Sequence, residues 1–451
     1  MGTDKIPKAL FSLAVPIIIS MLVQALYNIV DSIFVAQYNN SEGTAALTIA
    51  FPIQHLMIAV GAGLGVGMNA ILSRSLGEKK FDKANRVAGQ GIFLSLVGYL
   101  IFLVFGLFFV DMFALSQSDG NALLYQYSKD YITIISLGSI GVFMQITMER
   151  LLQSTGKSIY SMITQASGAI VNIILDPIFI FGKFGVPEMG LRGAAIATVI
   201  GQFVAATLGI VFNLTLNKEI TFKLKNLIPE KTLIKAVLLI GIPSVLMQSI
   251  GSVMTFSMNS ILRNFGLSAL NVFGIYFKLQ SFVFMPIFGL TNGVIPMVSY
   301  NYGAKKPERV FGTIKLGSIA SVSYMTFGLL IFQIFPETLL GLFNASAEML
   351  ILGKPALRII SISFVLAGFA IICSCVCQAL GKSTYSLVLS VLRQLGVLIP
   401  SAYLLSLSGK VNLIWWSFPI AELVSLIIAC AFLLKVLKLA FPKTHENLEI
   451  L

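Results

Sequence analysis

The feature that most constrains this chain is a series of apolar stretches, each long enough to cross a lipid bilayer as a helix. Such a helix needs about 20 predominantly apolar residues. The 451-residue chain is 57% hydrophobic and only 11% charged, which leaves too few polar residues to cover a water-soluble fold of this size. Unpaired backbone groups are not tolerated in lipid, and the stretches lack the alternation of a β-barrel, so the sequence predicts an all-α integral membrane protein. Twelve transmembrane helices are expected near residues 11–35, 46–72, 90–112, 131–152, 161–182, 191–214, 237–262, 270–298, 315–335, 355–378, 386–408 and 412–436.

The positions of the 31 Lys and Arg residues predict the orientation of these helices. If the N-terminus is cytoplasmic, most of them fall in loops on the cytoplasmic side and only a few in the opposite loops. The positive-inside rule therefore predicts a multi-pass protein of the plasma membrane with both termini in the cytoplasm. The net charge of +12 reflects this bias and gives no indication of nucleic-acid binding, because no single basic domain carries it.

Two similar nonapeptides, QSTGKSIYS at 153–161 and QALGKSTYS at 378–386, each contain the Gly-Lys-Ser that ends a phosphate-binding loop. Such a loop also needs a glycine five residues before the Gly-Lys pair, and Leu151 and Val376 stand there. We therefore expect no nucleotide binding. The favoured interpretation is a turn in which the glycine ends a helix and the lysine reaches the lipid headgroups.

The two nonapeptides belong to a repeat of the whole half-chain. Pro16 has a counterpart in Pro243, the polar stripe that ends in Asp31 reappears in a stripe that ends in Asn259, and LGEKK (76–80) matches YGAKK. Two six-helix lobes in the same orientation are the parallel repeat that many transporters use. The expected parts are an N-terminal lobe at 1–215, a cytoplasmic linker at 216–235, a C-terminal lobe at 236–440 and a cytoplasmic tail at 441–451.

Several segments together resemble the multidrug and toxic compound extrusion family, MATE. The resemblance covers nearly the whole chain, and it implies two lobes in a V shape and antiport of organic, often cationic, compounds against protons or sodium. It also implies an ion site in the first lobe, carried onto Asp31, Asn172 and Asp176. The matching segments are Pro16 with LYNIVDSIFV (26–35), AFPIQ (50–54), SRSLGEKK (73–80), LDP (175–177), PSVLMQ (243–248) and GLTNGVIPMVSYNYGAKK (289–306).

The residues of this ion site also stand out because they are polar or acidic residues inside predicted membrane helices, where a charge is energetically unfavourable. An ionised carboxylate inside a membrane costs several kcal/mol, so intramembrane acids usually face partners or water. Asp31 shares a helical face with Asn28 and Tyr27, and Asn172 lies one turn from Asp176. If the two helices face each other, the carboxyl pair could exchange a proton or bind sodium through its oxygens. We predict these five residues to form the ion-coupling site.

Structural roles for the same residues remain open alternatives. Asp31 could accept helix hydrogen bonds only, and Asp176 could cap a bend at Pro177. Two prolines inside predicted helices, Pro16 and Pro177, are expected to act as conformational hinges, because proline removes a helix hydrogen bond and allows bending.

A second group of side chains is a weaker hypothesis for the substrate cavity. These residues are polar or adaptable, and they lie on the first helices of the two halves: Gln24, Gln248, Met254, Met258 and Asn259. Four further polar residues inside apolar runs have either a structural or a functional role, and the sequence does not decide between them: His55, Lys278, Arg393 and Glu422. Glycines at alternate positions from 61 to 67 favour close helix packing.

The function expected from the sequence is export of organic compounds, in the first place cations, by alternating access. The exchanged ion is expected to be a proton, with sodium as the alternative. The partners are small organic molecules and membrane lipids, and we expect a monomer without cofactor or resident metal. A flippase for lipid-linked glycans, from the wider superfamily, is the nearest alternative. A membrane-embedded enzyme is disfavoured, because the only histidines are His55 and His445 and the sequence offers no metal-ligand set.

Overall fold

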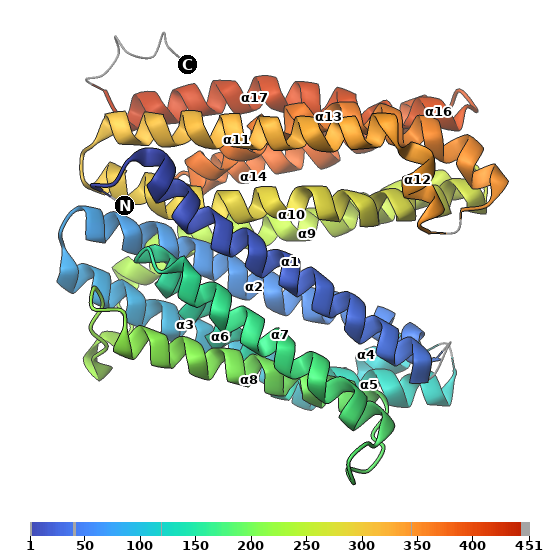
Figure 1. Cartoon of the computed structure of the whole chain (residues 1–451), viewed down its shortest axis with the longest axis horizontal. Helices are drawn as coiled ribbons and strands as arrows, with labels where there is room; N and C mark the ends of the chain where they lie inside the picture. The colour runs from blue at the N-terminus through green and yellow to red at the C-terminus, as the bar shows by residue number, and fades with distance from the viewer. Residues whose placement is uncertain (1, 39–41, 119, 344, 443–451) are drawn as a thin grey trace. The chain divides into compact units, whose positions relative to one another are not determined.

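The computed structural model describes the whole chain except residues 1, 39–41, 119, 344 and 443–451 (Figure 1). Its described residues form helices and no strands. The first half contains α1 (Ile6–Tyr38), α2 (Glu42–Gly77), α3 (Phe81–Phe108), α4 (Val110–Gln117), α5 (Ala122–Leu137), α6 (Ile140–Ser154), α7 (Ser158–Phe181) and α8 (Leu191–Thr215). The second half contains η1 (Leu224–Leu227), α9 (Lys231–Arg263), α10 (Leu267–Gly303), α11 (Pro307–Ile334), α12 (Pro336–Gly341), α13 (Ala347–Ala379), α14 (Ser383–Val391), η2 (Leu392–Leu398), α15 (Ile399–Ser406), α16 (Val411–Ile414) and α17 (Ser417–Ala440).

The described residues contain 11 helices long and apolar enough to cross a membrane, or 12 when one bent pair counts as a single span. The bent pair is α5 with α6, which meet at 46°. The sequence predicts one membrane helix near 131–152. The helix instead stops at Gly138, which is the C-cap of α5, and restarts after Ser139. With this pair counted as one, the prediction of an all-α protein with twelve spans is confirmed.

The two Gly-Lys-Ser segments adopt the same helix-ending turn. Gly156 and Gly381 have left-handed φ angles of 85° and 77°, which glycine adopts without steric cost. The backbone N–H of Lys157 donates to the carbonyl of Leu152 at 2.7 Å, and that of Lys382 to the carbonyl of Cys377 at 2.8 Å. These are the closing bonds of a Schellman turn. The interpretation of both segments as helix-ending turns is confirmed.

A second pair of turns repeats with equal fidelity after α2 and α10. Lys79 and Lys305 have φ angles of 58° and 55°, a conformation that non-glycine residues rarely adopt. In both turns the backbone N–H of the next lysine donates a hydrogen bond to the carbonyl oxygen five residues earlier. The N···O distance is 3.0 Å from Lys80 to Ser75 and also 3.0 Å from Lys306 to Asn301. The internal repeat therefore extends to unusual backbone angles, which supports two lobes built on one plan.

The helices group into two compact units whose boundaries fall inside α1 and α9. One unit, called here the N-terminal unit, runs from Val15 to Val245. The other, the C-terminal unit, combines the chain through Ala14 with the chain from Leu246 onward. Each unit thus contains the beginning of one long helix and the end of the other.

Close glycine contacts hold these helix beginnings in place within each unit. In the N-terminal unit a Cβ on Gly67 would lie 2.3 Å from the carbonyl oxygen of Val237 on α9. In the C-terminal unit a Cβ on Gly293 would lie 3.0 Å from Ala14 on α1. Both glycines therefore allow close approach of the helix backbones. The interpretation of the 61–67 glycines as packing residues is confirmed.

Each unit has its own apolar core. In the N-terminal unit Phe143, Tyr131 and Ile132 are buried together, and α7 and α8 run side by side (Figure 1). In the C-terminal unit α13 packs against α10, α11 and α17. Trp415, fully buried, stacks on Phe273 with ring centroids 6.5 Å apart.

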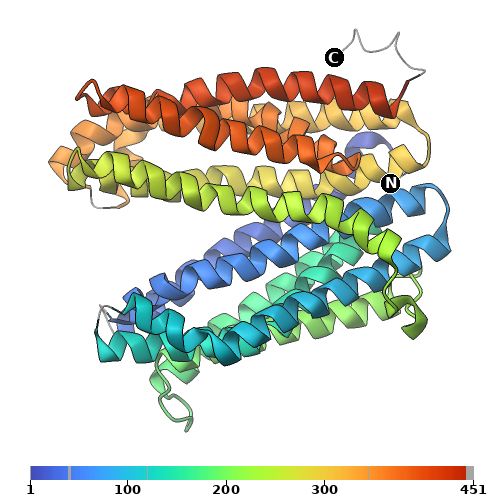
Figure 2. The same ribbon diagram turned by 180° about the vertical axis from the view of Figure 1, so that it is seen from behind.

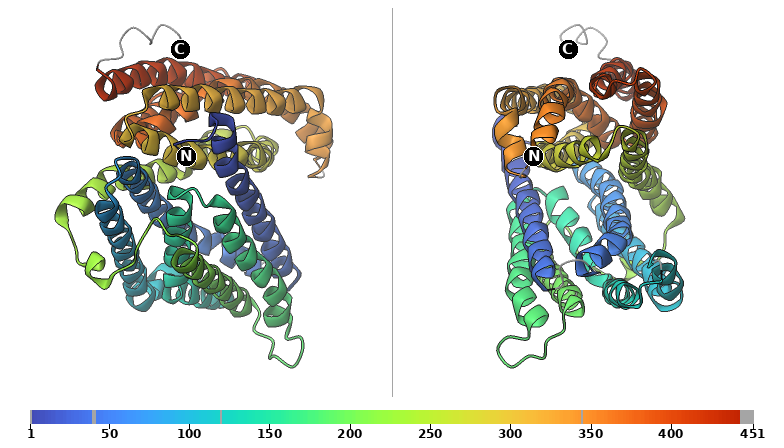
Figure 3. Two further views of the ribbon diagram at one scale, coloured as in Figure 1. Left: turned by 60° about the vertical axis from the view of Figure 1, so that its left-hand side comes forward. Right: turned by 90° about the vertical axis from the view of Figure 1, so that its right-hand side faces the viewer.

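Three features of the backbone cannot be predicted from the pattern of apolar residues. Short helices α4 and α12 follow α3 and α11 in the two halves. In the eleventh predicted span, α14, η2 and α15 follow one another as one rod, drawn in dark orange below the red α17 (Figure 2), and η2 is a π-helix. The loop at residues 182–190 projects beyond the ends of α7 and α8 (Figure 3).

Candidate functional site

The polar stripe of α1 faces α7 within the N-terminal unit. The hydroxyl of Ser20 donates to the side-chain oxygen of Gln165, and Gln165 Nε2 donates to Gln24 Oε1 at 2.9 Å. Further along the same pair of helices, the carboxyl groups of Asp31 and Asp176 are direct neighbours. The stripe read from the sequence is therefore the seam between these two helices, and Gln24, predicted for the substrate cavity, lies in it.

A small network surrounds the carboxyl pair. Asn172 Nδ2 donates to Asp176 Oδ1 at 3.2 Å and lies 3.4 Å from Thr198 Oγ1 on α8. Tyr27 and Tyr131 lie close enough to the carboxyl groups to interact with them electrostatically. The site thus draws on α1, α5, α7 and α8. Asn28 lies on α1 in the same stretch, and its side chain is outside the described part of the structure.

Burial gives this cluster its chemical character. Asp176 is 0% exposed and Asn172 is 2% exposed. Among the described residues, three buried oxygens in the cluster have no hydrogen-bond partner: Asp31 Oδ1, Asn172 Oδ1 and Asp176 Oδ2. Buried acceptors without donors are costly. A proton on a carboxyl group, or a cation held by several oxygens, would satisfy them.

The packing of α7 on α8 explains why these side chains meet. A Cβ on Gly201 would lie 2.7 Å from the carbonyl oxygen of Gly168 and 3.2 Å from the Cβ of Asn172. The glycine pair lets the two helix backbones touch one turn from Asn172. Thr198, on the face of α8 that carries Gly201, is thereby brought to Asn172.

The predicted hinges lie inside unbroken helices. Pro16 is within α1 and Pro177 within α7, so Pro177 directly follows the buried Asp176. A proline in a helix interior removes one backbone hydrogen bond and lowers resistance to bending. Both helices that carry the carboxyl pair therefore contain a weakened point.

The other residues of the cavity hypothesis lie on the part of α9 that belongs to the C-terminal unit. Met258 is fully buried and Met254 is 9% exposed, both within the apolar core of that unit. Gln248 and Asn259 are half-buried.

The four residues that the sequence left undecided each have a defined contact. Arg393 Nη1 lies 3.1 Å from Glu422 Oε1, and the two side chains are 24% and 13% exposed. Lys278 Nζ lies 5.8 Å from the ring centre of Phe343. His55 stacks on Phe51.

Three polar residues of the cluster were not found by sequence reasoning: Tyr131, Thr198 and Gln165. Each is one polar side chain among other polar residues of its segment or half, without a motif that marks it. Only its tertiary neighbours distinguish it from polar residues elsewhere. Within the described residues, no three His, Cys, Asp or Glu side chains gather as a metal-binding group.

Comparison with known proteins gives consistent matches over both halves. A family model described as MatE matches residues 16–178 and 243–404. The chain is 31% identical over 428 residues to multidrug export protein MepA of Staphylococcus haemolyticus, covering 94% of this chain and 92% of that protein. It is 27% identical over 446 residues to MepA of Staphylococcus saprophyticus, covering 98% and 96%. The structure of an outward-facing multidrug resistance MATE family transporter of the MOP superfamily superposes with a TM-score of 0.89 at 24% identity, covering 97% of each chain.

Proposed function

We propose that this chain, which belongs to the MATE family of membrane transporters, exports organic cations from the cell in exchange for protons. As a member of that family it is a transporter and not an enzyme. The relatives with the name multidrug export protein match more than nine-tenths of its length. That name supports organic compounds, rather than a lipid-linked glycan, as the cargo.

The observation that carries the coupling proposal is the carboxyl pair of the half-buried Asp31 and the buried Asp176, in which one oxygen of each carboxyl group is buried without a hydrogen-bond partner among the described residues. Two adjacent carboxylates in a site with little water repel each other and lose part of their hydration. One proton on a carboxyl oxygen turns that oxygen into a hydrogen-bond donor, and a neighbouring oxygen accepts the bond. A second proton neutralises the pair. Sodium is the alternative coupling ion, because the carboxylate and amide oxygens of this cluster are the type that a hard cation prefers.

The proposed cycle follows from that change of charge. In the inward-open state the ionised pair favours an organic cation in the N-terminal unit. In the outward-open state protons enter the pair, the electrostatic attraction for the cation is lost, and the substrate leaves. Neutralising the seam between α1 and α7 favours a different bend at Pro16 and Pro177, which reshapes the substrate site. Release of the protons to the cytoplasm resets the site.

The orientation and assembly belong to the same proposal. The lysine-rich turns and the linker lie on one side if the protein obeys the positive-inside rule, which puts both termini in the cytoplasm. We propose a monomer, because each unit has its own apolar core.

The test is drug efflux from proteoliposomes driven by an imposed pH gradient, and then by a sodium gradient. Asn has nearly the shape of Asp but cannot release a proton. Asp31→Asn and Asp176→Asn should therefore each reduce gradient-driven export to background while the purified protein stays monodisperse. Asn259→Ala, at the matching position of the second half, is the control and should keep most of the activity. Full transport by both Asn variants would show that the coupling site lies elsewhere. Transport driven by a sodium gradient but not by a pH gradient would show that sodium, not the proton, is the coupling ion.

A further inference from the structure

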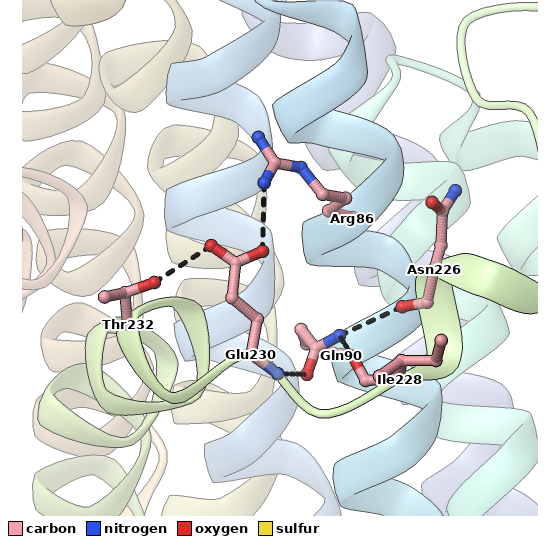
Figure 4. Close-up of polar contacts among 6 residues, drawn as sticks. All are labelled: Arg86, Gln90, Asn226, Ile228, Glu230 and Thr232. Carbon is pink, nitrogen blue, oxygen red and sulfur yellow. Dashed lines mark hydrogen bonds and ion pairs between the residues drawn. The ribbon is translucent and has the colours of Figure 1, made fainter.

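The chain segment between the two halves is clamped onto α3 by one buried side chain. Gln90 is 1% exposed. Its Nε2 donates to the carbonyl oxygens of Asn226 at 2.9 Å and Ile228 at 2.8 Å, and its Oε1 accepts from the backbone N–H of Glu230 at 3.0 Å (Figure 4). The end of the segment is therefore fixed against α3, and Glu230 is held at a defined place.

Glu230, which this clamp holds, lines a pocket of about 440 Å³. The pocket lies in the N-terminal unit, where the end of α2 meets the beginnings of α3 and α9. Its polar side is lined by Arg74, Lys83, Arg86, Glu230 and Thr232, and its apolar side by Ile71, Leu233 and Ala236. One side therefore suits a charged group, and the other suits hydrocarbon.

The polar side carries an excess of positive charge. Arg86 Nη1 lies 3.1 Å from Glu230 Oε2, and the hydroxyl of Thr232 donates to Glu230 Oε1 at 2.9 Å (Figure 4). Arg74 Nε lies 2.9 Å from Glu78 Oε1. Burial alone would raise the pKa of Glu78, but hydrogen bonds from Lys80 and Arg74 lower it, so this carboxylate stays ionised at neutral pH.

Lys83 differs from the two arginines. Among the described residues it has no carboxylate within ion-pair distance, and it is half-buried in the wall of the pocket. Its ammonium group can donate three hydrogen bonds. An anion bound between Lys83 and the arginines would add negative charge where the lining has three cations and one carboxylate.

Large exposed apolar side chains lie on the same chain segments as residues that line this basic pocket. Leu224 of η1 is 85% exposed, Ile228 is 68% exposed, and Phe81, two residues before Lys83, is 52% exposed. Leu239 and Ile242, further along α9, are 59% and 50% exposed. Basic pockets between membrane helices at the cytoplasmic surface bind anionic lipid headgroups, and exposed apolar side chains nearby suit the acyl chains of the same lipid.

We propose that this pocket binds the phosphate-bearing headgroup of an anionic phospholipid. The phosphate lies between Lys83, Arg74 and Arg86, and the acyl chains run along the half-buried Ile71 and Ala236 into the bilayer. On the orientation given under the proposed function, the lipid belongs to the cytoplasmic leaflet. It contacts α2, α3, α9 and the clamped segment at once, so it holds the beginning of α9 to the N-terminal unit.

The test is lipid binding by native mass spectrometry of the full chain, titrated with phosphatidylglycerol and with zwitterionic phosphatidylcholine. Phosphatidylglycerol should bind preferentially. Each basic residue near a membrane surface changes affinity for anionic lipid by roughly fivefold. Lys83→Ala should therefore weaken the tightest phosphatidylglycerol adduct about fivefold, and Lys83→Ala with Arg74→Ala by about 25-fold. Lys83→Arg should retain binding.

Two further variants keep the result interpretable. Lys225→Ala removes the same charge from the exposed η1 but does not line the pocket, and it should bind as the original chain does. Thr232→Glu adds a carboxylate at an exposed position of the lining, so it should fold and still lose affinity about fivefold or more.

Two outcomes would overturn the proposal. The first is equal phosphatidylglycerol binding by the original chain and the Lys83→Ala, Arg74→Ala variant. The second is glycerol 1-phosphate binding as tightly as the lipid, which would assign the pocket to a soluble phosphate compound. The measurement needs no transport, so either outcome leaves the proposed export function standing.

Discussion

Replacing Gly201 with Ala tests whether the contact between α7 and α8 sets the geometry of the coupling site. The added Cβ would lie 2.7 Å from the carbonyl oxygen of Gly168, where ordinary contacts begin at 3.4 Å. The two helices must therefore separate locally by about 0.7 Å. Asn172 Nδ2 already lies 3.4 Å from Thr198 Oγ1, so this separation breaks the hydrogen bond between the two helices.

The expected energetic effect follows from two opposing terms. Overpacking costs about 1–3 kcal/mol, and replacing glycine by alanine in a helix returns up to about 1 kcal/mol. With the full gain from alanine, Gly201→Ala should therefore lower the free energy of unfolding by up to about 2 kcal/mol. Export driven by a pH gradient should fall about tenfold or more, because a displacement near 1 Å at a precisely arranged site is costly.

The assay combines thermal unfolding, followed by circular dichroism, with gradient-driven efflux from proteoliposomes. Gly274→Ala is the matched control, because nothing lies within 4 Å of the added Cβ; its unfolding temperature should stay equal or rise. Thr198→Val removes the hydrogen bond without separating the helices, so it should reduce transport with little change in helix packing. A Gly201→Ala protein with unchanged unfolding temperature and normal efflux would refute the argument.

Three other predictions concern parts of the chain outside this contact. Gln90→Leu loses three hydrogen bonds to the linker and should cost about 2–3 kcal/mol, seen as a lower unfolding temperature and faster tryptic cleavage within 218–231. Cysteines at Lys80 and Lys382, which are exposed turn positions, should react with impermeant thiol reagents only from the cytoplasmic side; labelling from outside intact cells would contradict the orientation. Glu422→Gln leaves the mostly buried Arg393 without its charge partner and should destabilise by about 3–5 kcal/mol, whereas replacing both by Met and Leu should be nearly neutral. A double variant that still fails to export would give the pair a role in transport.

The membrane spans could be predicted from the sequence because the hydrocarbon layer imposes a minimum length that no soluble helix needs. The same pattern could not show the break at Gly138. A bilayer-length apolar run looks alike whether it is straight or bent by 46°. The π-helix at Leu392–Leu398 was missed for a related reason: one extra residue in a turn changes the hydrogen bonds and leaves the apolar composition unchanged.

The candidate site shows the same division between local and tertiary information. Asn172 and Asp176 were paired in the sequence because residues four apart share a helix face. The neighbours Thr198 and Tyr131 belong to other helices. Which helices touch depends on small residues such as Gly201. The chain has 38 glycines, and no periodic pattern in the sequence shows which of them lies at a close helix contact.

Comparison of the two halves separates what the backbone requires from what coupling requires. The close contact at Gly67 has a counterpart at Gly293, and the left-handed Lys79 has a counterpart at Lys305. Both pairs solve a problem of chain geometry that arises once in each half. The acid of the first helix does not repeat in this way. The polar stripe that ends in Asp31 in the first half ends in Asn259 in the second half. An acid that only accepted helix hydrogen bonds would be equally useful in both halves, because the helices are alike. The presence of this acid in one half only therefore favours a role in coupling. It also predicts that exchanging the two residues, in the double variant Asp31→Asn with Asn259→Asp, will not restore gradient-driven export. The reason is that position 259 lacks the neighbours Asn172 and Asp176 that α7 provides to Asp31.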